Sequence, residues 1–206
     1  MNENNIAVRL FFSKTGRAKY ISALDLITCF QRAIRRTDIP IWHTQGFNPH
    51  TYVNVNLPLS LGSEGVNESM DIKLTEVRDK LNAVLPPDIR IIRVALPVKK
   101  HTEIEKSVYS VNIVCDYDKL EEFMKLPSVE VEKKTKKGIT TLDIKPFTEI
   151  KNYERGHFTL IMPSGCDFTL NPSLFFDAFE KFSGEETERL DIVRTGILCK
   201  DGTQFE

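Results

Sequence analysis

Two histidines lie close together in the stretch HTQGFNPH, at His43 and His50, with six residues between them. Imidazole titrates near neutral pH, so such a pair can act as acid and base or hold a metal ion. A metal site would need a third ligand, and the neighbouring sequence offers none. We therefore expect no metal, and we take His43 and His50 as the candidate catalytic residues. The alternative is that both rings hydrogen-bond the backbone of an irregular loop.

The residues between the histidines favour a shaped loop. Gly46 permits a positive φ, while Pro49 fixes its own φ and biases Asn48 toward extended backbone. These features need no ligand, but they do not account for Phe47, whose ring could stack on a nucleic-acid base. For Trp42, the only tryptophan, we favour packing in the core. In a separate loop, LGSEGVNE, the spacing of a phosphate-binding loop is missing and Gly62 indicates a hairpin turn.

Basic residues are concentrated in the first part of the chain. Residues 1–50 hold seven Lys and Arg against three acids, although the whole chain has a net charge of −1. Three of them, Arg32, Arg35 and Arg36, come at the end of a predicted helix. Arginine forks suit phosphate, so this end is a candidate polyanion site. The alternative is that the arginines complement the helix dipole.

That helix is predicted over ISALDLITCFQRAIRRTD, with Ser22 as its N-cap and Asp25 three residues later. Its apolar side chains fall on one face, and its outer face becomes basic toward the C-terminal end. The expected core-facing residues are Leu24, Ile27, Phe30 and Ile34. The helix would therefore carry the arginines on a firm support.

The order of predicted elements over residues 6–97 is strand, helix, strand, strand, helix, strand. This is the ferredoxin-like order. After a polar stretch the pattern begins again with one extra strand. The predicted fold is α+β, with two tandem ferredoxin-like domains and antiparallel sheets, at residues 1–98 and 107–206. A single larger α+β sheet is the alternative.

Several function classes find no support in the sequence. No apolar run could cross a bilayer, and the first residues do not resemble a secretory signal, so we expect a cytoplasmic protein without a membrane partner. The four cysteines are scattered, which argues against a disulfide scaffold or an iron–sulfur motif. Motifs of serine hydrolases and zinc proteases are also missing, and we expect no cofactor.

Four stretches together resemble one family: RLFFSKTGRAKYISALDLITCFQRAIRRTDIP, QGFNPH, LPLSLGSEGVNESMDIKL and IVRTGIL. It is the bacterial radical-SAM-linked family, a domain of unknown function found alone or at the C-terminus of radical-SAM proteins. The resemblance covers nearly the whole chain and implies an accessory role beside such an enzyme. The positions that match are Lys14, Ser22, Asp25, Arg32, Arg35, Arg36, Gly46, Phe47, Asn48, Pro49, His50, Gly62 and Glu68.

The leading hypothesis is an RNA-binding accessory module for RNA modification, with a radical-SAM protein as partner. The expected polyanion-binding residues are Lys14, Arg17, Arg32, Arg35, Arg36, Phe47, Asn48 and His50. One rival is a metal-independent endoribonuclease resembling CRISPR repeat-processing enzymes, with His43 or His50 as general base. The other rival is a protein–protein adaptor that binds no nucleic acid.

Overall fold

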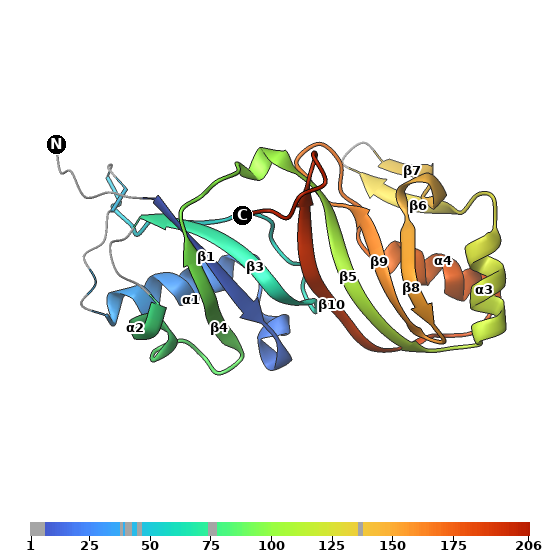
Figure 1. The fold of residues 1–206 in the computed structure, drawn as a ribbon, viewed down its shortest axis with the longest axis horizontal. Helices are drawn as coiled ribbons and strands as arrows, with labels where there is room; N and C mark the ends of the chain where they lie inside the picture. Colours follow the sequence, from blue (N-terminus) through green and yellow to red (C-terminus); the bar gives the residue numbers. More distant parts are fainter. Residues whose placement is uncertain (1–6, 38, 40–42, 45–46, 74–77, 136–137) are drawn as a thin grey trace.

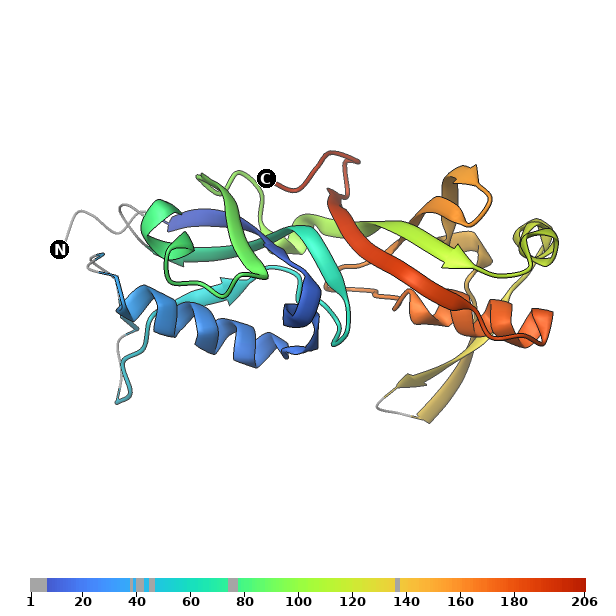
Figure 2. The same cartoon turned by 90° about the horizontal axis from the view of Figure 1, so that it is seen from below.

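The protein has a mixed α+β fold in which one long, mostly antiparallel sheet runs through the whole molecule (Figure 1). The computed structural model describes residues 7–37, 39, 43–44, 47–73, 78–135 and 138–206. Trp42 and Gly46, which were assigned to the core and to the loop, lie outside these described residues. The two halves of the chain each contribute strands to the sheet, and helices pack against it (Figure 2).

The first half has the predicted order of elements. Strand β1 (Ala7–Lys14) leads through a short 3-10 helix, η1 (Gly16–Tyr20), to helix α1 (Ala23–Arg35). Strands β2 (Val53–Val55) and β3 (Glu64–Lys73) follow, and helix α2 (Arg78–Asn82) and strand β4 (Ile89–Ala95) complete this half.

The second half has more strands than predicted. It contains η2 (His101–Glu103), β5 (Ile104–Val114), α3 (Tyr117–Lys125), β6 (Glu130–Thr135), β7 (Gly138–Asp143), η3 (Lys145–Phe147), β8 (Glu149–Glu154), β9 (His157–Pro163), α4 (Ser173–Ser183) and β10 (Glu188–Cys199). Strands β6 and β7 form a hairpin of their own, as predicted from the lysine-rich stretch. Strand β8 was missed because EIKNYE is too polar to show an apolar alternation.

The strands of the two halves meet between β3 and β10. The order is β4-β1-β3-β10-β5-β9-β8, with β2 also pairing to β3. The contact is a short parallel ladder of two residue pairs, Val193 with Glu64 and Arg194 with Gly65. The halves therefore share one sheet, as in the alternative of a single larger sheet. The expected arrangement of two separate ferredoxin-like domains is not confirmed.

Helix α1 begins as the sequence predicts. The Ser22 hydroxyl accepts a hydrogen bond from the Asp25 backbone N–H at 3.1 Å and donates one to the Asp25 carboxylate at 2.7 Å. Its buried face differs from the prediction at one position, because Leu24 is 76% exposed while Leu26 is buried. At 100° per residue Leu24 lies about 120° around the helix from the buried Phe30, so it points away from the sheet.

The core of the first half forms between α1 and the sheet. Leu10 and Phe12 of β1 and Met70 of β3 pack in one cluster with Phe30, whose ring meets that of Phe12 edge-on at 5.3 Å between centroids. The opposite face of β1 is covered by the last residues of the chain. Arg9 stacks on the Phe205 ring at 4.1 Å and donates to the Glu206 backbone carbonyl at 2.7 Å. Both faces of β1 are thus buried.

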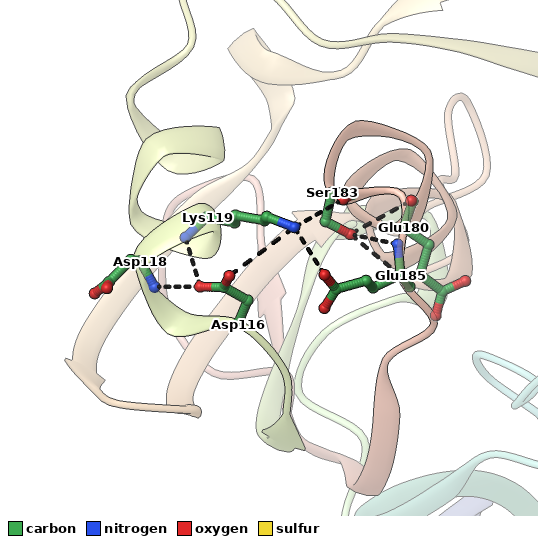
Figure 3. A network of polar contacts seen from close by, with 6 residues as sticks. All are labelled: Asp116, Asp118, Lys119, Glu180, Ser183 and Glu185. Carbon is green, nitrogen blue, oxygen red and sulfur yellow. Dashed lines mark hydrogen bonds and ion pairs between the residues drawn. The ribbon is translucent and has the colours of Figure 1, made fainter.

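A polar network fixes α3 against the end of α4 (Figure 3). The Asp116 carboxylate accepts hydrogen bonds from the first backbone N–H groups of α3, at Asp118 and Lys119. The Lys119 ammonium donates to the Ser183 carbonyl at 3.1 Å and to Glu185 at 2.8 Å. These contacts cap one helix and tie it to the other. The network thus stabilises the packing of α3 against the end of α4.

Candidate functional site

The basic end of α1 carries three exposed arginines, Arg32, Arg35 and Arg36. Within the described part of the chain, none of their guanidinium groups makes a hydrogen bond or ion pair. The helix ends at Arg35, and the Arg36 backbone N–H donates to carbonyls of the last turn. Cations suit this position because they complement the helix dipole, and among the described residues no acidic side chain pairs with any of the three.

Two of these arginines line a groove. Arg32 and Arg36 stand four residues apart on one side of α1, facing Val84, Leu85 and Pro86 across a cavity of about 470 Å³. Cys29 lies in the same groove. Burial raises the pKa of its thiol, while Arg36 and Arg32 act to lower it. The groove thus joins two cations to an apolar wall, and the acidic residue Asp25 lines it as well.

The loop that follows α1 folds back as a narrow hairpin. His43 and Thr51 form a bridge, and the Thr44 backbone N–H donates to the His50 carbonyl at 2.8 Å. The Gln31 side chain of α1 donates to the Thr51 carbonyl at 3.1 Å, which holds the base of the loop against the helix. Phe47, Asn48 and Pro49 are exposed near its tip, and Phe47 is exposed over its whole side chain.

The two candidate histidines lie at the base of this loop, and both are exposed. The His50 Nδ1 atom lies 3.0 Å from the Thr44 hydroxyl and 3.1 Å from the Asn48 carbonyl. When Nδ1 carries the proton and donates it to that carbonyl, Nε2 keeps a free lone pair. Among the described residues, no three His, Cys, Asp or Glu side chains gather where they could hold a metal ion.

The other predicted binding residues lie elsewhere. Arg17 is exposed in η1, at the opposite end of α1, about 20 Å from the three arginines along a helix of 13 residues. Gly62 has a φ of 83° in the loop before β3, a backbone conformation that glycine adopts without strain. Lys14 is buried, with 1% exposure, and is not on the surface that Arg32, Arg35 and Arg36 share.

Lys14 belongs instead to a buried group of charged and polar side chains. We call it the junction cluster, and it consists of Lys14, Glu68, Tyr109 and Arg194. Arg194 of β10 pairs with Glu68 of β3 through Nε at 2.9 Å and through a second, very short contact from Nη2. The same Nη2 donates to the Leu57 carbonyl at 2.6 Å. Both side chains are at most 3% exposed. Arg194 is thus paired directly with the Glu68 carboxylate where the halves meet, whereas the Lys14 ammonium donates to the Lys19 carbonyl at 3.4 Å and interacts with Glu68 only electrostatically.

The pKa values of the cluster reflect its burial. Burial lowers the pKa of Lys14; the Glu68 carboxylate acts to raise it, and the Arg194 guanidinium lowers it further. For Arg194, burial opposes the charged form, but Glu68 and Tyr109 hold its pKa above the ordinary value.

Sequence reasoning named Lys14 and Glu68 but missed Arg194 and Tyr109. The available signal in the sequence was an arginine inside the apolar strand stretch IVRTGIL, because a charge buried in a strand requires a buried partner. Gly65 is part of the same arrangement, because a Cβ there would lie 2.1 Å from a Glu68 oxygen. The carboxylate can approach β10 only because that position has no side chain.

A cavity of about 300 Å³ opens beside the junction cluster. Tyr109 belongs to both, and the walls come from both halves. Lys19, Ser60 and Glu64 line it from the first half. Asn171, Arg189 and Asp191 line it from the second. We call it the junction cavity.

Comparisons with known proteins give a family but no activity. The model of a family described as "Uncharacterized protein conserved in bacteria (DUF2344)" matches residues 7–171. No curated protein matches the chain. A chain in the solved structure "Crystal Structure of a Cbf5-Nop10-Gar1 Complex" is 14% identical with a TM-score of 0.47, over 92% of the present chain and 48% of that one. The present chain thus spans about half the length of that chain. In the described residues, no helix is both long and apolar enough to span a membrane.

Proposed function

The chain belongs to this uncharacterized bacterial family, and we propose that it is an accessory module that binds RNA through the basic end of α1. The observation that carries the proposal is the set of three exposed arginines without ion-pair partners in the described chain. Arg32 and Arg36 lie together on one side of the helix end. Arg35 lies on another side, four residues after Gln31, which contacts the loop. Phosphates could therefore be bound on two sides of the helix.

The loop beside this surface supports RNA in particular. Phe47 offers an exposed ring, and single-stranded RNA is commonly held by base stacking on aromatic side chains next to a cationic groove. Single exposed apolar side chains are normal on protein surfaces, so the support for stacking comes from the place of Phe47 in a loop that is held against α1. Asn48 and His50 are exposed beside it and can contact a base or sugar.

The first test is a titration of fluorescent single-stranded RNA against the protein and its Arg32→Glu/Arg35→Glu/Arg36→Glu variant. We expect binding to weaken at least about tenfold in the variant. The slope of log affinity against log salt should shrink by about 2, since each phosphate contact on a single strand contributes about 0.7. Phe47→Ala should weaken binding by about 1–3 kcal/mol with the salt slope unchanged.

The matched control makes the same change in net charge at the far end of the molecule, in the variant Lys125→Glu/Arg155→Glu/Lys181→Glu. These three side chains are exposed and lie in or beside α3 and α4. Binding equally weak in both variants would mean that only net charge matters, and the proposal would fail. No RNA binding by the unaltered protein at low salt would favour the protein–protein adaptor instead.

A second function, metal-independent RNA cleavage, is favoured by the contacts of His50. Its Nδ1 contact to the Asn48 carbonyl can hold the ring in the tautomer whose Nε2 accepts a proton. Incubation of the same RNAs with EDTA should then yield fragments, lost in His50→Ala and retained in His43→Ala. Intact RNA in all samples would exclude this activity for those RNAs and leave the binding role.

The proposed setting is RNA modification, in which the module would hold RNA for a separate enzyme. The radical-SAM partner rests on the sequence resemblance alone. Copurification of the tagged chain from nuclease-treated lysate, followed by a search of the retained proteins for a radical-SAM enzyme, tests it. Failure to retain one would remove that partner without affecting the RNA titration.

A further inference from the structure

The junction cavity has the position expected of a ligand site. It lies where the halves meet, and the Asn171 amide of the second half reaches the Ser60 hydroxyl of the first half at 3.3 Å. Clefts between two structural units are common places for small ligands, and about 300 Å³ is at the lower end of the usual range. A cavity of this size suits a single nucleotide better than a duplex or a large cofactor.

The chemistry of the walls is mixed in sign. Lys19 is a cation at one side, with its Nζ 3.3 Å from Glu64 and both side chains partly exposed. Asp191 lies on the other side, and within the described residues its carboxylate has no hydrogen-bond or ion-pair partner. A ligand that carries both an anionic group and hydrogen-bond donors would complement this pair. A nucleotide does so, through its phosphate and through its ribose hydroxyl and base amino groups.

One wall of the cavity is formed by Tyr109, which links it to the junction cluster. Tyr109 is buried there and contacts Arg194, which Glu68 and the Leu57 carbonyl hold in place. Arg17 and Lys19 both lie in η1, at the end of α1 opposite the three arginines. One strand could therefore run along α1, from the basic end to the cavity, over about 20 Å.

We propose that the junction cavity holds one nucleotide of a bound RNA strand, with its phosphate beside Lys19 and its donor groups facing Asp191. The nucleotide would be unstacked from its neighbours, as when proteins splay bases into pockets. This inference rests on the proposed RNA-binding function and names the part of the RNA that is recognised.

The test uses the four mononucleotides AMP, GMP, CMP and UMP with the full chain, followed by ¹⁵N NMR. At roughly 1 mM, we expect at least one to shift the amide signals of Gly62 and Asn171. Ser60→Trp places a large ring in the cavity and should weaken that binding at least about tenfold. Asp191→Asn should weaken it by a smaller factor, because the amide keeps one acceptor oxygen. Ser128→Trp, at an exposed site beyond α3, should leave it unchanged.

The outcomes separate this inference from the proposed function. RNA that binds through the three arginines while no mononucleotide shifts the cavity signals would overturn the cavity assignment alone. Mononucleotide binding that survives Ser60→Trp would also overturn it, since the ligand would then lie elsewhere. If Ser60→Trp abolishes mononucleotide binding while substitution of the three arginines leaves RNA affinity unchanged, the result would support the cavity and overturn the α1 surface.

Discussion

At the scale of single residues, Glu68 is the side chain on which the junction depends. Its carboxylate accepts two hydrogen bonds from Arg194 and acts to raise the pKa of Lys14. Removing one partner of a buried ion pair leaves the other charge uncompensated, which costs far more than the loss of an exposed pair. The free-energy cost of removing a charge from this cluster therefore depends mainly on how deeply the cluster is buried.

Glu68→Gln should therefore lower the free energy of unfolding by about 3–5 kcal/mol. Urea denaturation followed by circular dichroism measures it. Glu64→Gln is the matched control, since Glu64 pairs with Lys19 near the surface and its loss should cost at most about 1 kcal/mol. Equal effects of the two substitutions would show that Glu68 is not the counter-charge described above.

Lys14 predicts a dependence of stability on pH. Burial lowers its pKa below the ordinary 10.5, so the folded chain releases this proton at a lower pH than the unfolded chain does. Between the lowered value and 10.5 the unfolded state binds more protons, and stability rises with pH. The unfolding free energy of the protein minus that of Lys14→Met should therefore increase between about pH 7 and pH 10. A flat difference would contradict the lowered pKa.

At the scale of elements, α1 is the support that positions the arginine surface. Its start is fixed by the reciprocal contacts of Ser22 and Asp25, and its middle by Phe30 in the core. Its end is left open to solvent with Arg32, Arg35 and Arg36. The helix is thus anchored along its length, with Ala33 and Ile34 in the core beside the exposed arginines.

Ser22→Ala should destabilise the protein by about 1 kcal/mol, because the first turn loses its side-chain cap. Thr28→Ala, on the exposed face of the same helix, should have an effect within about 0.5 kcal/mol, since the Thr28 hydroxyl only back-bonds to the Leu24 carbonyl. Thermal unfolding of both variants gives the comparison. RNA affinity should be unchanged in Ser22→Ala at temperatures where the protein is folded.

At the scale of the whole molecule, the shared sheet makes the halves depend on each other. Separation between residues 98 and 107 would expose the β3 and β10 edges and deprive Glu68 and Arg194 of each other as ion-pair partners. It would also remove Phe205 and Glu206 from the face of β1. We therefore expect residues 98–107 to separate the two halves along the chain without separating two independently stable domains.

Fragments 1–98 and 107–206, produced separately, should unfold at lower urea concentration than the full chain or fail to fold. Mixing them should restore part of the lost stability, because the junction ladder and ion pair can re-form. The intact chain should unfold in a single transition. Two independent transitions, each matching one fragment, would show that the halves are autonomous domains.

Local signals in the sequence predicted the local structure well. Ser22 as a cap, the order of elements in the first half and the exposed arginines follow from neighbours a few residues away. Lys14 and Arg194 could not be assigned in that way, because a buried charge is explained only by partners distant in the chain. Lys14 was accordingly placed at the surface with the other cations, and the polar β8 was missed. The roles of His50 and Phe47 stay predictions.

The pairing of Glu68 with Arg194 spans 126 residues, which has a consequence for synthesis. At about 5–20 residues per second, a ribosome needs about 6–25 s to pass from one partner to the other. During that interval the nascent first half holds Lys14 and Glu68 without their arginine, and the β3 edge is uncovered. During this period the nascent chain can aggregate or bind chaperones. The period ends only when β10 has left the exit tunnel.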